Sequence, residues 1–304
     1  MLCLGPTPAG LTPRKWLDTR ARFLDRYFVA PGETPSGPVL EAQDRTLRRF
    51  GEYDEVVLWF GPDLYCQTLL AYLLDWFGAR YLGDTRLSLV LVTEHADAPG
   101  CRSCTPAFLS PESLRAAFDA RHPVTETALA LGARAWAAIT APKPLELQAL
   151  ATHETPALPP MRAALARHLL ELPFVVGGTS FTERAVLAIL ADGAERELAD
   201  LFGAFQEREQ RQWLTDQAFL VGLERMASGR APLLALDGAR TATEGPLPGR
   251  ARITRLGASV HAGDSDWIAR AGIDRWVGGV HLKGREAAWR WDAAAGAPRA
   301  MPLT

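Results

Sequence analysis

The sequence predicts a mixed α/β protein whose first half is Rossmann-like. Residues 56–60 form a short apolar run rich in β-branched and aromatic side chains, which is typical of a strand buried on both faces. The stretch at 64–77 follows with almost no polar stripe, so it is predicted to be a buried helix. A second apolar run at 87–92 completes a strand, helix, strand order, and this order implies a parallel crossover.

Three segments differ in composition along the chain. We expect a Rossmann-like α/β domain in residues 1–122, a connector of Ala- and Leu-rich helices in 123–172, and a winged-helix-like α+β domain in 173–304. In the last segment three predicted helices precede two strand candidates, which is the order of a winged helix-turn-helix. Its tail at 264–292 carries four of the nine tryptophans and is expected to seal the two halves together.

Apolar periodicity and capping residues predict the remaining elements in chain order. Ser110 is placed to cap one helix, and Ser180 with Glu183 has the spacing of a capping box. The predicted helices span residues 14–28, 40–50, 111–120, 126–139, 145–151, 161–172, 180–190, 195–210 and 215–227. Strand candidates follow at 232–236 and 251–254.

Length and charge exclude several classes of protein. A chain of 304 residues with 48% apolar and 22% charged residues has the composition of an ordinary globular protein. Its net charge of −2 gives no drive toward nucleic acid or anionic membranes, and no run approaches the roughly 18 apolar residues of a membrane helix. The first residues lack the pattern of a secretory signal, so a cytoplasmic location is expected.

The four cysteines do not predict a disulfide framework. Cys101 and Cys104 have the spacing of half a zinc site, but no second pair exists and only scattered histidines could complete it. Two thiols in a loop rich in proline and glycine are therefore the favoured interpretation, and no metal site is expected.

Polar residues follow both predicted strands at their carboxyl ends, where open α/β sheets bind ligands. Asp63 and Gln67 lie at the start of the predicted buried helix, and Glu94 and His95 come just after the second strand. These four are the candidate ligand-binding residues, although Asp63 also has the position of a plain helix N-cap. The usual phosphate, nucleophile and zinc motifs are all missing from the sequence, so the sequence leaves the identity of any cofactor open.

A winged helix suggests DNA binding, but the charge does not favour it. Residues 173–304 contain 16 Lys and Arg against 16 Asp and Glu, and the would-be recognition helix at 215–227 is not basic. Arg250, Arg252 and Arg255 cluster on the predicted wing and are the candidate DNA contacts. Nucleic acid is not the expected partner, and a packing or protein-contact module is favoured.

Several motifs resemble a pair of bacterial families designated domain of unknown function 1835 and its C-terminal companion, domain of unknown function 3658. The resemblance covers nearly the whole chain, and its motifs are specific when taken together. They are YDEVVLWF at 53–60, Asp63-Leu64-Tyr65 with Gln67, LDWF at 74–77, SFTE at 180–183, IDRWVGGVH at 273–281 and WRWD at 289–292. Because the families have no assigned activity, the resemblance implies a bacterial source but no particular chemistry.

The departures from the family pattern fall at the candidate site. Family members carry Glu and His before the Asp of this turn and a second Asp before the Gln, where this chain has Gly61, Pro62 and Cys66. A His-Glu-Gly-Pro segment of the families corresponds to Cys3-Leu4-Gly5-Pro6. Members also begin some tens of residues earlier, with a strand. The resemblance implies a chain that has dropped most of these titratable residues, or one whose recorded start is too late and whose sheet lacks its first strand.

Three functions are compatible with these features. The favoured hypothesis is a non-catalytic or degenerate α/β domain that binds a small molecule or a partner and is coupled to a winged-helix contact module. The alternatives are an enzyme acting on a nucleotide or phosphorylated small molecule near Asp63, and a ligand-sensing transcriptional regulator. In the enzyme, Asp63 would be a general base or metal ligand. An open sheet edge left by a missing strand would also allow a homodimer.

Overall fold

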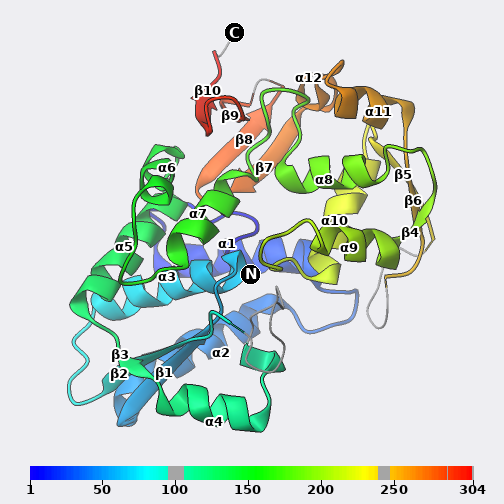
Figure 1. The fold of residues 1–304 in the computed structure, drawn as a ribbon. Helices are drawn as coiled ribbons and strands as arrows, with labels where there is room; N and C mark the ends of the chain where they lie inside the picture. Colours follow the sequence, from blue (N-terminus) through cyan, green and yellow to red (C-terminus); the bar gives the residue numbers. More distant parts are fainter. Residues whose placement is uncertain (95–105, 239–246, 286, 303–304) are drawn as a thin grey trace.

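The computed structural model describes residues 1–94, 106–238, 247–285 and 287–302, and within them it is a mixed α/β protein with four small sheets (Figure 1). The predicted parallel crossover is confirmed. β1 (Glu55–Phe60) pairs in parallel with β2 (Arg86–Leu91), and α3 (Leu64–Gly78) connects the two strands. A short strand that was not predicted, β3 (His122–Pro123), pairs antiparallel with β2. Among the described residues β1 forms one edge of this sheet.

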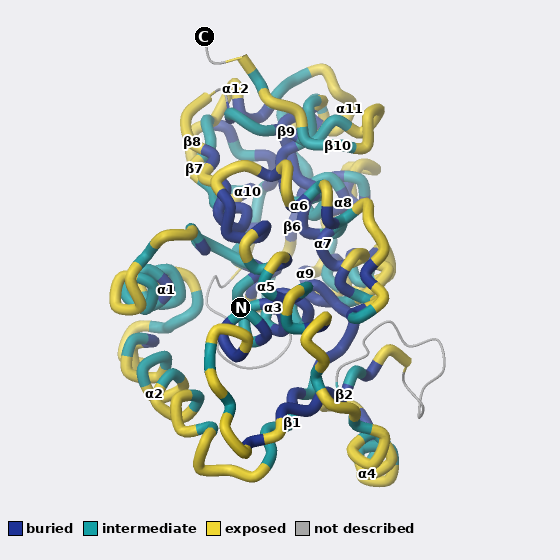
Figure 2. Tube along the Cα trace, turned by 90° about the vertical axis from the view of Figure 1, so that its left-hand side faces the viewer, coloured by how far each residue is buried: buried dark blue, intermediate teal, exposed yellow. Residues whose placement is uncertain are grey.

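Both faces of β1 are covered, as its apolar sequence predicts. Leu58 packs in one core with α3, whose Leu70 and Leu74 have no exposed surface. On the other face Trp59 packs against α4 (Pro111–Asp119), where its ring stacks on Phe118. Figure 2 shows α3 buried along most of its length and α4 at the surface of the molecule. The helix predicted to be buried is therefore confirmed as the centre of the first half.

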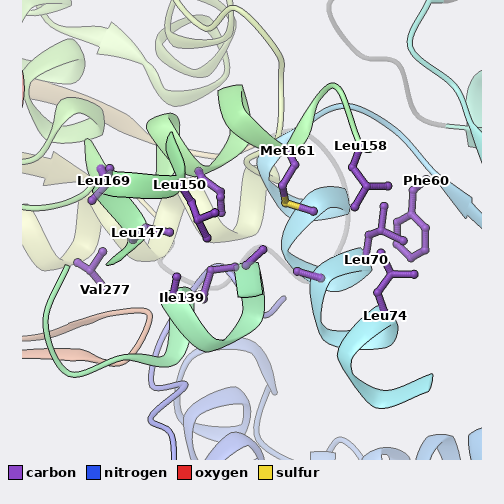
Figure 3. Close-up of a cluster of buried hydrophobic side chains, with 14 of the residues drawn as sticks. Phe60, Leu70, Leu74, Ile139, Leu147, Leu150, Leu158, Met161, Leu169 and Val277 are labelled. Atoms are coloured by element: carbon purple, nitrogen blue, oxygen red, sulfur yellow. The ribbon is translucent and has the colours of Figure 1, made fainter. Parts of the chain in front are cut away.

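The larger hydrophobic core joins α3 to the predicted helical connector (Figure 3). The connector consists of α5 (Glu126–Thr140), α6 (Leu145–Thr152) and α7 (Met161–Leu169). Gly132 lets α5 approach α3 closely, because a Cβ at this position would lie 2.3 Å from the Cβ of Leu74. The remaining helical segments of this half are α1 (Pro13–Phe28), α2 (Ser36–Arg48) and the 3-10 turns η1 (Phe50–Glu52) and η2 (Pro106–Phe108).

A second core contains the predicted three helices and two strands of the C-terminal half. These are α8 (Phe181–Ile189), α9 (Leu198–Gln206), α10 (Asp216–Ala227), β5 (Leu234–Asp237) and β6 (Arg250–Ile253). The capping box of Ser180 and Glu183 at the start of α8 is confirmed. An additional strand, β4 (Arg196–Glu197), precedes α9 and pairs with β6, so the sheet order is β4-β6-β5.

One candidate residue of the expected wing lies elsewhere. α11 (Arg255–Ala262) begins directly after β6, because the Thr254 hydroxyl caps it by accepting from the backbone N–H of Gly257. Arg255 is therefore the first residue of a helix, whereas Arg250 and Arg252 belong to β6.

The tryptophan-rich tail forms strands that were not predicted and contacts both cores. Its elements are α12 (Trp267–Ala271), β7 (Ile273–Val277), β8 (Val280–Gly284), β9 (Trp289–Asp292) and β10 (Ala297–Ala300). Trp267 packs in the second core, whereas Trp289 and Trp291 pack against the larger one. The hairpin turn at Gly279 abuts the end of α5, where a Cβ would lie 1.8 Å from the carbonyl oxygen of Thr140. A side chain at this turn would push the hairpin off α5.

His168 on α7 is buried. Among the described residues neither of its ring nitrogens has a hydrogen-bond partner. Burial lowers its pKa to about 4, and the nearby Arg167 guanidinium acts in the same direction while the Glu171 carboxylate opposes it. The folded protein thus holds His168 neutral. An unfolded chain protonates the same side chain near pH 6.5.

Replacing His168 with leucine should therefore make the free energy of unfolding less sensitive to mild acid. The unfolded state binds more protons between pH 6.5 and pH 4, so this histidine favours unfolding increasingly as the pH falls through that window. From pH 7 to pH 5 the wild type should lose about 2 kcal/mol more than the leucine variant. Urea unfolding of both proteins at the two pH values measures the difference. Equal losses would show that His168 is protonated in the folded state.

Candidate functional site

A groove of about 620 Å³ lies between the start of α3 and the second core, close to the carboxyl end of β1. Segments far apart in the chain form its walls: the start of α3, η2, α9, the segment leading into α10, and Leu247 just before β6. The lining residues are Asp63, Tyr65, Cys66, Phe108, Ala199, Phe202, Gln206, Gln212, Trp213, Leu214, Thr215, Asp216 and Leu247. Its volume is that of a small-molecule site.

Asp63 is the one predicted site residue among these lining residues, and it serves as a helix cap. Its Oδ1 accepts the backbone N–H of Cys66 at 3.0 Å, and the carboxylate is almost completely buried. Gln67 lies behind the groove wall with no exposed surface, and its Nε2 donates to the carbonyl oxygen of Gly61 at 2.7 Å. Both side chains thus hold the turn between β1 and α3 in place.

Glu94 does not reach the groove. Thr93 and Glu94 follow β2 at the same edge of the sheet as Asp63, but the Glu94 side chain is exposed and does not line the groove. His95, Cys101 and Cys104 fall outside the described residues. Of the predicted ligand-binding residues that the structure describes, Asp63 alone lines the groove.

The amino-terminal segment packs against the same turn, which was not foreseen. The chain begins in the middle of the molecule, between the sheet and the C-terminal half (Figures 1 and 2). Cys3 is buried in the second core together with Leu64 at the start of α3. Burial raises the pKa of the Cys3 thiol to about 12, and the Asp63 carboxylate adds to that shift. Gly5 allows the close fit, since a Cβ there would lie 2.5 Å from the Phe23 ring.

Cys66 is the one thiol among the described residues that line the groove, and its environment suppresses ionisation. Burial, together with the adjacent Asp63 carboxylate that also accepts a hydrogen bond from the thiol, raises its pKa to about 12. Tyr65 also has a raised pKa, again mainly through burial. At neutral pH both groups are protonated, so neither supplies a nucleophile or a base.

Alkylation of Cys66 should accordingly be slow. Iodoacetamide at pH 7.5 is expected to modify Cys66 about 30-fold or more slowly in the folded protein than in urea, because the thiolate fraction falls more than thiolate reactivity rises. The folded rate should still climb about tenfold per pH unit between pH 8 and pH 10, where the unfolded rate levels off. Mass spectrometry of the Cys66 peptide measures both rates. A folded rate that levels off near pH 8 would contradict a suppressed thiolate.

Residues of the C-terminal half dominate the groove, and sequence reasoning missed them. The indole N–H of Trp213 donates to Glu209 Oε1 at 3.2 Å, and Gln206 Nε2 donates to the carbonyl oxygen of Leu214 at 3.3 Å. These bonds hold the segment between α9 and α10 in the groove wall. The sequence places Trp213 next to Gln212 between two predicted helices, and this was the available signal for a binding residue. A pattern of this kind does not indicate which part of the fold the segment contacts.

The candidate DNA contacts are partly neutralised. Arg250 forms ion pairs with Glu197 at 2.6 Å and Glu195 at 3.4 Å, both on the neighbouring strand region. Hydrogen bonds to Glu197 and Glu195 raise the pKa of Arg250. The arginine cluster predicted from the sequence therefore supplies less free positive charge than its composition suggests.

Comparison with known proteins identifies no matching family model, and no curated protein or solved structure matches the chain. The resemblance to the two families of unknown function stays a prediction. Within the described residues no group of three or more His, Cys, Asp or Glu side chains could hold a metal ion. In the same part of the chain no helix combines the length and apolar character needed to cross a bilayer.

Proposed function

We propose that this protein binds a small molecule without converting it, in the groove between a Rossmann-like half and a winged-helix-like half. One observation carries the proposal: the groove lies beside the carboxyl end of β1, yet three side chains at the start of α3 already have structural roles. Asp63 caps α3, Gln67 bonds to Gly61, and the Cys66 thiol is held neutral. A volume of about 620 Å³ is thus combined with side chains that have little capacity for acid-base or nucleophilic chemistry.

Two features support the architecture in this proposal. The parallel pair β1 and β2, with α3 on one face and α4 on the other, is the local arrangement of a Rossmann-like sheet. The order α8, β4, α9, α10, β5, β6 with pairing β4-β6-β5 corresponds to a winged helix.

The packing of α10 argues against a transcriptional regulator. In a winged helix the third helix would enter the major groove of DNA. Here α10 lies against the end of α1, where Gln217 Nε2 donates to the carbonyl oxygen of Phe28 at 3.3 Å and Phe28 packs against the second core. Because α1 packs against α10, the helix that would read DNA already has a contact within the same chain. This favours a packing role for the winged-helix-like half over DNA binding.

The groove also argues against an enzyme acting on a nucleotide or phosphorylated molecule. Such a substrate needs cationic side chains or free backbone N–H groups at its phosphates. The described residues that line the groove include no Lys, Arg or His, and the N–H of Cys66 at the start of α3 is already bound to Asp63.

The non-catalytic proposal agrees with the resemblance to the families of unknown function. That resemblance implies titratable residues at three positions where this chain has Gly61, Pro62 and Cys66. A homodimer through the edge of β1 stays a prediction, and sedimentation equilibrium of the purified protein tests it.

A ligand screen tests the proposed function. Wild-type protein and the groove-filling variant Ala199→Trp are compared by thermal shift against a library of small metabolite-like molecules, nucleotides and divalent metals. We expect compounds that stabilise the wild type and leave the variant unaffected, and mass spectrometry should recover them unchanged after long incubation. Product formation in the wild type would overturn the non-catalytic proposal. Stabilisation of both proteins by the same compounds would exclude the groove as the site.

A further inference from the structure

The walls of the groove point to a chemical class of ligand, an inference that rests on the function proposed above. We infer that the groove binds a planar aromatic molecule that carries no anionic group. Three properties of the lining residues lead to this: their aromatic content, the sign of their charges, and the occupied state of the nearby backbone donors.

Aromatic side chains form much of the groove wall. Tyr65, Phe202 and Trp213 line it from three different elements, and Phe108 stands at η2 with 63% of its surface exposed. Large aromatic walls bind flat rings through stacked and edge-to-face contacts, which are favourable beyond the buried area alone. Ala199 on α9 also lines the groove, and its short side chain leaves space there for a ligand ring.

The charges in the groove are of one sign. Asp63 and Asp216 contribute carboxylates, whereas the Cys66 thiol and the Tyr65 phenol have raised pKa values and are neutral at pH 7. No cationic side chain occurs among the described residues that line it. An anionic group entering the groove would lose hydration and meet carboxylates without a compensating cation, which is unfavourable at short range.

Two helices begin at the groove, and in each of them the capping side chain already accepts one backbone N–H of the first turn. Asp63 accepts from the N–H of Cys66 at the start of α3, and Thr215 accepts from the N–H of Ala218 at 3.2 Å at the start of α10. The N–H of Gln217 donates to Asp216 Oδ1 at 2.7 Å. Some of the N–H donors that bind phosphate at other helix starts are therefore already used here by the protein itself.

A matched pair of fluorescent probes tests the inference. N-phenyl-1-naphthylamine is neutral, and 8-anilino-1-naphthalenesulfonate has the same ring system with one added sulfonate. We expect the neutral probe to bind with a Kd about tenfold lower than the anionic one at low salt. Titration of each probe into the wild-type protein measures the two affinities.

Variants assign the binding to the groove. Ala199→Trp should abolish binding of the neutral probe, whereas Ala42→Trp, an equally exposed change on α2, should leave it unchanged. Asp216→Asn should strengthen binding of the sulfonate probe without altering the neutral one, because Asp216 is an exposed carboxylate of the wall.

The outcomes separate the ligand class from the site. Equal affinity for both probes, with both blocked by Ala199→Trp, would overturn the ligand class and leave the groove as a binding site. Binding of the neutral probe that Ala199→Trp does not reduce would overturn the site, and with it the proposed function.

Discussion

Replacing Arg167 with methionine is expected to lower the free energy of unfolding by about 3–5 kcal/mol. Arg167 on α7 donates to Glu209 Oε1 at 2.6 Å and to Glu171 Oε1 at 2.8 Å, and the Glu209 side chain is only 2% exposed. Its guanidinium also lies over the Trp213 ring, 5.2 Å from the centroid. The arginine thus connects the larger core to the segment that forms the groove wall.

The loss is large because methionine removes a cation that pairs with two carboxylates. Burial disfavours the ionised form of Glu171, but the Arg167 charge, hydrogen bonds from Thr182 and Arg167, and the Arg275 charge together outweigh it, so the pKa of Glu171 is lowered. Without the guanidinium both carboxylates lose charged hydrogen bonds in a site shielded from water, which is strongly unfavourable. The Trp213 indole, which donates to Glu209, should then lose its fixed position.

Urea unfolding measures this effect, and Arg162→Met on the same helix is the control. Arg162 pairs with Glu154 at 2.6 Å, but both side chains are exposed, at 47% and 81%, so the control should lose less than about 1 kcal/mol. Similar losses in the two variants would mean that the buried network adds nothing beyond a surface ion pair. The Arg167 variant should also bind the neutral naphthylamine probe more weakly, since it loosens one wall of the groove.

Arg20→Met should release the amino-terminal segment and cost about 3 kcal/mol. The Arg20 side chain is 2% exposed and donates to the carbonyl oxygens of Leu4 at 2.8 Å, Pro6 at 3.1 Å and Met1 at 2.5 Å. Burial lowers its pKa to about 10, so the guanidinium remains charged at neutral pH. Hydrogen bonds from a buried charged donor are among the stronger ones, and three carbonyl groups lose their donor together.

Amide hydrogen exchange measures whether the amino-terminal segment is released in Arg20→Met. The N–H of Thr7 donates to Gly278 and that of Ala9 to Thr140, so both amides report whether the segment remains docked. They should exchange much faster in Arg20→Met, while amides in α10 stay protected. Arg22→Met, an exposed change on the same helix, serves as the control and should alter neither exchange nor stability. Unchanged protection of Thr7 and Ala9 in the Arg20 variant would refute this role.

The elements with strong local signals were predicted well. The all-apolar stretch of α3 and the capping side chains of Asp63, Ser110 and Ser180 act within a few residues, so their patterns locate helix starts. The short strands β3, β4 and β7 to β10 were missed. Two to five residues provide too little alternation to distinguish a strand from a loop, and their pairing is decided by the partner strand.

The candidate site was predicted in part for the same reason. Asp63 lies just after the carboxyl end of β1. The rule that open α/β sheets bind ligands at the carboxyl ends of their strands therefore locates it. Trp213, Phe202 and Leu247 reach the same groove from the other half of the chain, and periodicity indicates that such residues are buried without indicating what they meet. The docking of residues 1–9 against that turn has no local signature at all.

The sequence by itself determined the parallel crossover around α3, the helix caps and the near-neutral net charge. Each of these depends on residues close together in the chain or on composition. Only the tertiary structure decided that Arg20 binds the first residues, that Arg167 joins α7 to Glu209, and that a groove forms above Asp63. These features depend on contacts between residues far apart in the sequence, and such contacts are selected by the packing of the whole chain.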